Sequence, residues 1–107
     1  MAWKAFGSAR AVPLLLASLA ALGGHGAAAN ARTPERIYAT TCGYCHGHDV
    51  GPIIRGRQLP AAAITDFVRR GYGAMPAFRP TEITNDELKG LASWVAASKP
   101  DPNEHGQ

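Results

Sequence analysis

Apolar residues recur at helical spacing in three stretches of the chain beyond residue 30. The first stretch starts at Thr33, where threonine is a favoured N-cap, Pro34 suits the first helical position and Glu35 suits the helix dipole. The residues that are expected to share one face of this helix are Ile37, Thr41 and Cys45. The pattern therefore predicts that this helix delivers the cysteine-containing segment, residues 42–46, to the core.

Two further helices are predicted from their end signals. The second runs from about Pro60 to Arg70, and Gly71 is placed as a C-terminal stop. Its apolar stripe consists of Ile64, Phe67 and Val68. The third begins with a capping box, Thr84-Asn85-Asp86-Glu87, and closes at Lys99-Pro100. Its expected buried face consists of Leu88, Leu91, Trp94 and Val95. No alternating strand pattern occurs, so the expected fold class is all-α with three main helices.

Two glycine- and proline-rich loops, residues 47–59 and 71–83, separate the predicted helices. Long loops without secondary structure are usually functional or disordered. These two contain several apolar residues, which disordered linkers seldom do: Ile53, Ile54, Leu59, Met75 and Phe78. We therefore expect both loops to wrap around something apolar. Residues 101–107 are polar and are predicted to form a flexible tail.

The amino-terminal residues are typical of a cleaved secretory signal. Lys4 and Arg10 supply positive charge, and residues 11–22 form an apolar run of about 12 residues, short for a bilayer span. Small residues follow, with cleavage expected near Ala29 or Ala31. The signal peptide is thus predicted over residues 1–29 and the folded domain over residues 30–100. Export to the periplasm is the expected outcome.

Residues 42–46 read Cys-Gly-Tyr-Cys-His, the C-x-x-C-H pattern of c-type haem attachment. Cys42 and Cys45 are the only cysteines, and each thiol would form one thioether bond to a single haem c. His46 would then be one axial iron ligand. Zinc and thiol-redox sites also use such cysteines, but zinc needs further ligands and a redox motif would sit near a βαβ pattern. Haem attachment also agrees with export, because bacteria attach this cofactor outside the cytoplasm.

Met75 is the predicted second axial ligand and is the only methionine beyond residue 29. A thioether on a stiff loop before Pro76 suits ligation, whereas a gap-filling methionine is more typical of a helix face. Among the other histidines, His48 lies too near His46 to reach the opposite haem face. A carbonyl of Gly51-Pro52 is the expected acceptor for the His46 Nδ1–H.

Other residues near the predicted haem have plainer roles. Arg55 and Arg57 are candidates for pairing with a haem propionate, with a solvated surface position as the alternative. Tyr38 and Trp94 are expected to pack where the first and third helices cross.

Size and charge limit the possible functions. Residues 30–107 permit one small domain that a covalent haem would help to stabilise. The 107-residue chain has a net charge of +3, but residues from Asn30 onward have only +1, and two propionates would bring this to about −1. Nucleic-acid binding is therefore not indicated.

The order of pentad, Gly-Pro loop, helix, methionine loop and helix resembles the class I cytochromes c. The chain more closely resembles the cytochrome subunit of p-cresol methylhydroxylase and eugenol hydroxylase-type flavocytochromes. The segments that carry this resemblance are 42–46, 51–54, 56–60, 68–71 and 74–78. The stretch between His46 and Gly51 is shorter than in the p-cresol enzymes, which leaves the partner's substrate open.

The resemblance implies an electron-transfer subunit that is not catalytic alone. An FAD-containing partner would oxidise a 4-alkylphenol, and this chain would pass the electrons to a soluble periplasmic acceptor such as a blue copper protein or another cytochrome. The alternative is a free-standing cytochrome c that donates electrons to a respiratory oxidase. A peroxidase or haem sensor is disfavoured, because Met75 would close the sixth coordination position.

Overall fold

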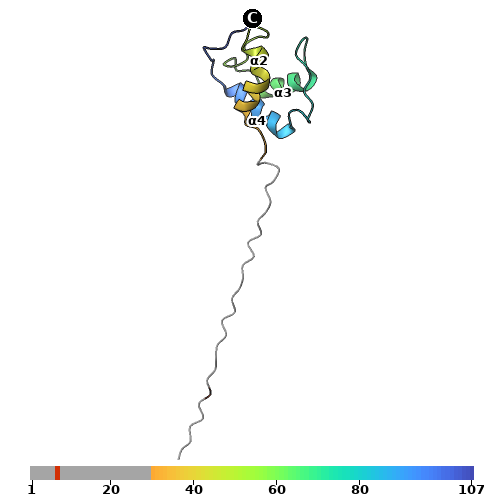
Figure 1. The fold of residues 1–107 in the computed structure, drawn as a ribbon, viewed down its shortest axis with the longest axis vertical. Helices are drawn as coiled ribbons and strands as arrows, with labels where there is room; N and C mark the ends of the chain where they lie inside the picture. The colour runs from red at the N-terminus through yellow and green to blue at the C-terminus, as the bar shows by residue number, and fades with distance from the viewer. Residues whose placement is uncertain (1–6, 8–29) are drawn as a thin grey trace, which may run out of the picture.

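The computed structural model describes Gly7 and residues 30–107, which fold into helices joined by loops (Figure 1). In chain order the elements are α1 (Pro34–Ile37), the π-helix η1 (Tyr38–Cys42), α2 (Gly43–His46), α3 (Ala61–Arg70) and α4 (Asn85–Ala97). This part of the chain contains two isolated β-bridges and no strand, which confirms the predicted all-α fold. The predicted signal peptide lies outside the described residues, apart from Gly7. None of the described helices combines the length and the apolar character needed to cross a membrane.

The first helical unit begins as predicted but is not a regular α-helix throughout. Thr33 caps α1, and its hydroxyl accepts a hydrogen bond from Arg36 N at 3.3 Å. In η1 the backbone N–H of Gly43 bonds to the carbonyl of Tyr38, five residues back. A π turn holds more residues than an α turn, so it rotates the residues that follow it.

Because of this rotation, the buried residues of the first helical unit differ from those that the sequence predicted. Ile37 and its neighbour Tyr38 are buried, whereas Cys45 is exposed. Cys42, the first residue of the pentad, is the cysteine that packs against the core. The predicted shared face of Ile37, Thr41 and Cys45 is therefore wrong at Cys45, because it assumed an unbroken α-helical period, whereas the segment does reach the core through Cys42.

The core lies where α1 and α3 pack against α4. Its most deeply buried side chains are Ile37, Ile83, Leu91 and Val95. Tyr38 and Trp94 pack at the crossing of the first and last helices, as predicted, with ring centroids 5.3 Å apart. The predicted stripe of α3 is confirmed at Ile64 and Val68, but Phe67 is 48% exposed and packs edge-on against Tyr72.

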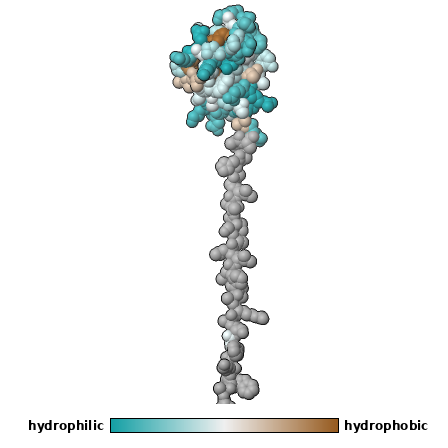
Figure 2. All heavy atoms as spheres, turned by 90° about the vertical axis from the view of Figure 1, so that its left-hand side faces the viewer, coloured by the Kyte–Doolittle hydropathy of each residue, from teal (hydrophilic) through white to brown (hydrophobic). Residues whose placement is uncertain are grey.

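The surface of the folded domain is mostly polar on the face that Figure 2 shows. Hydrophilic residues cover most of this face, and hydrophobic residues interrupt them only in small, separate areas. Such scattered apolar residues are normal on a protein surface. The apolar side chains of the three helices are thus largely used in the core.

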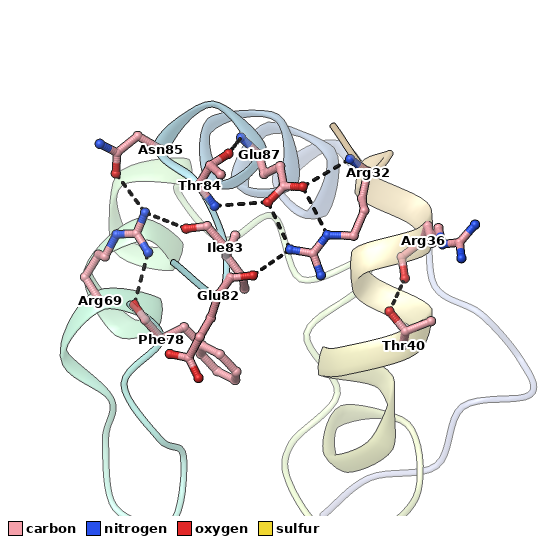
Figure 3. A network of polar contacts seen from close by, with 10 residues as sticks. All are labelled: Arg32, Arg36, Thr40, Arg69, Phe78, Glu82, Ile83, Thr84, Asn85 and Glu87. Carbon is pink, nitrogen blue, oxygen red and sulfur yellow. Dashed lines mark hydrogen bonds and ion pairs between the residues drawn. The ribbon is translucent and has the colours of Figure 1, made fainter. Parts of the chain in front are cut away.

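A polar network joins the chain ahead of α1 to the start of α4 (Figure 3). The predicted capping box is present: Thr84 Oγ1 accepts from Glu87 N, and Glu87 Oε2 accepts from Thr84 N. Arg32 donates to both Glu87 carboxylate oxygens, at 3.0 and 2.9 Å, and to the carbonyl of Glu82. These hydrogen bonds, together with the bond from Thr84 N, lower the pKa of Glu87 to about 2. Glu87 thus serves as both the cap of α4 and the anchor of Arg32.

Residues 101–107 were predicted to be a flexible tail, but they lie against the loop that follows α2. The backbone of His105 donates to the Gly47 carbonyl at 3.1 Å and accepts from Asp49 N at 2.9 Å. Arg55 pairs with Asp101 at 3.0 Å, and Gln107 donates to the Asp49 carbonyl. Figure 1 shows the carboxyl-terminal end returning to the region of α2. The polar composition of the segment gave no sign of these contacts.

The Glu87 carboxylate predicts a pH-dependent contribution to stability. Its folded pKa of about 2 lies below the ordinary value of 4.5. The contribution should therefore be complete above about pH 5 and should fall as the pH drops from 4.5 towards 2. Replacing Glu87 with Gln should lower the free energy of unfolding by about 1–3 kcal/mol at pH 7. Between pH 5 and 2 this difference should disappear.

Denaturant unfolding of both proteins across pH 2–7 measures that difference. The exposed residue Glu35 provides a matched control, because Glu35→Gln removes a first-turn carboxylate that makes no ion pair with the described residues. A constant difference between Glu87→Gln and the parent protein across this range would contradict the prediction.

Candidate haem site

The cysteine–histidine pentad extends from the end of η1 through α2. Both cysteines are free thiols; Cys42 is half-buried against the core and Cys45 is exposed. Burial raises the pKa of the Cys42 thiol to about 11, so it remains protonated at neutral pH. A redox-active C-x-x-C motif instead needs a cysteine whose pKa is lowered. The thiol-redox alternative is therefore poorly supported by this environment.

The imidazole of His46 is held by the loop that follows α2. Nδ1 of His46 lies 2.8 Å from the carbonyl oxygen of Pro52, the acceptor expected from the sequence. A carbonyl oxygen only accepts hydrogen bonds, so Nδ1 carries the proton. In a neutral imidazole this leaves the lone pair of Nε2 free for a metal ion. The hydrogen bond therefore selects the tautomer that an axial ligand needs.

Gly51 allows the loop to approach this imidazole closely. A Cβ atom at position 51 would lie 3.3 Å from His46 Nδ1 and 3.4 Å from Cε1. The backbone N–H of Gly51 also donates to the Cys45 carbonyl at 2.8 Å. The Gly51-Pro52 pair thus supplies both the space and the acceptor for His46.

Met75 lies in the loop between α3 and α4, where it is half-buried against the core. Tyr72 and Met75 exchange two backbone hydrogen bonds of 3.0 Å, which close a tight turn. The backbone N–H of Phe78 donates to the Val68 carbonyl at 2.8 Å and ties the loop to α3. Two neighbours of the methionine, Ala74 and Ala77, are exposed.

Arg69 braces this methionine loop, a role that the sequence did not predict. Its guanidinium donates to the carbonyls of Phe78 and Ile83, each at 3.0 Å, and to Asn85 Oδ1 at 2.8 Å (Figure 3). The sequence around Arg69 did not indicate this role, because all three acceptors lie nine or more residues further along the chain. The fixed fork of the guanidinium suits such a multiple contact.

The remaining predicted residues divide between the site and other parts of the fold. His48 Nδ1 lies 2.6 Å from the Gly43 carbonyl, so this histidine is engaged by α2. Arg55 pairs with Asp101 and Glu104, whereas Arg57 is exposed. Within the described residues, no three His, Cys, Asp or Glu side chains gather as a metal-binding group. The donors that a zinc site would require are therefore not assembled in this region.

The donor set fits a haem group. Two reduced thiols three positions apart are followed directly by an imidazole in the ligating tautomer. A soft thioether is present in the other glycine- and proline-rich loop. Together, the helices and these donors define a small helical cytochrome c.

The comparisons with known proteins agree with this class. Residues 29–95 match the family described as cytochrome c oxidase, cbb3-type, subunit III, and the chain belongs to this family.

The chain is also similar to the 4-cresol dehydrogenase (hydroxylating) cytochrome c subunit of Pseudomonas putida. The two sequences are 38% identical over 65 residues, or 59% of this chain and 58% of that relative. The match thus spans less than two thirds of the relative's length.

Two solved structures are similar in fold. A crystal structure of p-cresol methylhydroxylase with substrate bound gives a TM-score of 0.57 and 36% identity, over 64% of this chain and 95% of that chain. A second, at 2.5 Å resolution, gives a TM-score of 0.55 and 36% identity, over 62% and 93%. The fold of the described residues is therefore that of a cytochrome c subunit.

The glycines around Met75 predict how far this loop tolerates side chains. Gly71 has φ of +70°, and a Cβ there would lie 2.6 Å from the Met75 carbonyl oxygen. Gly73 has φ of +57°, but a Cβ there would meet no atom of the described residues within 4 Å. Gly73→Ala should therefore cost about 1 kcal/mol, from backbone conformation alone. Gly71→Ala should cost about 2–4 kcal/mol, because the turn must also shift.

Denaturant unfolding of the haem-loaded protein gives both free energies. Gly73→Ala is the matched control, since it introduces the same methyl group at a positive φ in the same loop. Equal losses in the two variants would show that the close approach of Gly71 to Met75 is unimportant.

Proposed function

We propose that this protein is a periplasmic electron-transfer cytochrome with a single covalently bound haem c. Cys42 and Cys45 form the two thioether bonds, and His46 and Met75 are the axial iron ligands. The observation that supports this assignment most strongly is the hydrogen bond from His46 Nδ1 to the Pro52 carbonyl, at 2.8 Å. That contact leaves Nε2 unprotonated, which is the state in which an imidazole binds a metal ion.

The bound haem would supply one-electron redox chemistry. The residues of this chain hold it and set its environment. His46 keeps Nε2 unprotonated through its bond to Pro52. The Met75 thioether favours ferrous iron and raises the reduction potential. Apolar residues of both loops pack against the core, among them Ile54 and Leu59 in the first loop and Phe78 in the second.

Export to the periplasm is part of the proposal. The predicted signal sequence precedes the folded domain, and cleavage after Ala29 or Ala31 would retain Arg32. Arg32 is needed in the mature chain because it pairs with Glu87 at the start of α4.

The proposed partner is an FAD-containing flavoprotein that oxidises a 4-alkylphenol of the p-cresol or eugenol type. The 38% identity to a 4-cresol dehydrogenase cytochrome subunit supports this pairing. Electrons would enter this chain singly from the flavoprotein and leave to a soluble acceptor, such as a blue copper protein or another cytochrome. The phenol chemistry would belong to the partner.

A second candidate is a cytochrome that donates electrons to a respiratory oxidase. The description of the matched family, which names an oxidase subunit, favours this alternative. Both candidates use the same haem ligands and differ in the protein that docks.

Replacing Met75 with Ala should remove the iron–sulfur absorption band near the red edge of the ferric spectrum. The potential should also fall, because the ligand that favours ferrous iron is lost. Optical spectroscopy and potentiometric titration of the purified haem protein measure both effects. Ala74→Gly, a change at the exposed neighbouring residue, should preserve the band. An unchanged spectrum in Met75→Ala would rule out methionine ligation.

Purification from the native host under mild conditions distinguishes the two partners. We expect the cytochrome to co-elute with a flavoprotein whose bound FAD is reduced by a 4-alkylphenol. Addition of the phenol should then reduce the haem in the complex. A persistently monomeric cytochrome, or one that co-elutes with oxidase subunits, would contradict the flavocytochrome proposal.

A further inference from the structure

A compact group of charged residues lies behind the loop that holds His46. The guanidinium of Arg55 forms ion pairs with two carboxylates. Its Nη1 lies 3.0 Å from Asp101 Oδ2 and 3.5 Å from Glu104 Oε1. The Glu104 side chain is only 12% exposed and that of Arg55 is 22% exposed. Charges so poorly solvated are costly unless they are paired. The arrangement therefore differs from an ordinary surface ion pair, such as that between Asp66 and Arg70.

Aromatic rings fix the Arg55 guanidinium in place. Its central carbon lies 5.2 Å from the centroid of the Trp94 ring and 5.7 Å from that of Tyr38. Cation–π attraction at such distances holds a guanidinium against the ring faces. Since Trp94 belongs to α4 and Tyr38 to η1, the cation is bound to the rigid helical crossing.

The same group contacts the His46 loop at two points. A Cβ atom at Gly47, the residue directly after His46, would lie 3.1 Å from Glu104 Cγ. Arg55 is three residues beyond Pro52, whose carbonyl accepts the hydrogen bond from His46. Glu104 thus lies against the start of the loop, and it also pairs with Arg55 further along the same loop.

Backbone contacts of residues 98–106 secure this arrangement. Gly56 has φ of +71°, and a Cβ there would overlap the Pro100 ring, so the two segments are in direct contact. Ser98 Oγ accepts from Gly56 N, and Gly106 packs against Ile53. Residues 98–106 therefore form a strap across the outside of the His46 loop.

We propose that Arg55 and Glu104 are positioning residues, which hold the loop that orients His46 and set the reduction potential of the haem. This inference rests on the proposed axial role of His46. The carboxylates of Asp101 and Glu104 favour the oxidised state, in which the iron carries one more positive charge, and Arg55 opposes them. The potential is then a balance between the cation and its two anions.

Three buried polar atoms of this group face the same pocket as the ion pairs. Tyr38 Oη, Arg55 Nε and Glu104 Oε2 are buried and have no hydrogen-bond partner among the described residues. All three residues line one pocket of about 340 Å³. Burial and the nearby Glu104 carboxylate also raise the pKa of Tyr38, so its hydroxyl stays protonated and can donate.

Charge-removing variants of the haem-loaded protein test this role. Arg55→Met should lower the potential, and the isosteric Glu104→Gln should raise it. We expect each to change the equilibrium constant for electron exchange with a reference cytochrome about threefold, or about 28 mV for a one-electron couple. Arg55→Lys keeps the charge and should restore most of the parent potential. A purely structural role would change stability without producing shifts of opposite sign.

Matched controls are available on the surface. Arg36→Met removes an exposed cation from α1, and Asp66→Asn removes an exposed carboxylate from α3, so both should leave the potential within experimental error. Shifts of the same sign in Arg55→Met and Glu104→Gln, or shifts no larger than the controls, would overturn the inference. If Arg55→Met yields no haem protein, the other two variants test the inference. Glu104→Gln should still raise the potential, and Arg55→Lys should stay close to the parent potential. If the unsubstituted protein shows no histidine-ligated haem, the proposed function itself fails.

Discussion

The hydrogen bond between His46 Nδ1 and the Pro52 carbonyl is the contact on which the site depends. It fixes the tautomer of the imidazole and the direction of Nε2. To make it, the chain must turn back sharply after α2, and Gly51 provides the space for that turn. A larger residue at position 51 would push the ring away or move the carbonyl. The geometry of the candidate site is therefore decided by backbone placement more than by the ligand itself.

The backbone of this loop is stabilised by residues that are distant from it in the sequence. The loop after α2 has little secondary structure of its own. Residues 98–106 pack along it through His105 and Gly106, and Asp101 pairs with Arg55 of the loop. The methionine loop is built differently, because a tight turn between Tyr72 and Met75 and the Arg69 contacts hold it to its own neighbouring helices. The two candidate ligands are thus held by separate sets of contacts. A change in one loop can alter its ligand without directly disturbing the other.

The sequence predicts the features that local signals encode. Thr33 and Thr84 cap their helices and Gly71 ends α3, because each acts on residues within one turn. The pentad and the Gly51-Pro52 acceptor also belong to short stretches of chain. Contacts between distant segments left no comparable signal: Arg32 with Glu87 is separated by 55 residues and Arg55 with Asp101 by 46. The π turn in η1 was also missed, since the expected four-residue spacing of Ile37, Thr41 and Cys45 looked regular.

The π turn has a consequence for how the two cysteines differ. Because it rotates α2, Cys42 faces the core while Cys45 faces outward. The two thiols of the pentad therefore have unequal surroundings. A regular α-helix would have placed Cys45 on the face of Ile37, towards the core. The extra residue in the turn therefore places the pentad at the boundary between the core and the surface, where the loop that follows α2 contacts it. Insertions of this kind are frequent at functional sites, and here the insertion directly precedes the residues that define the site.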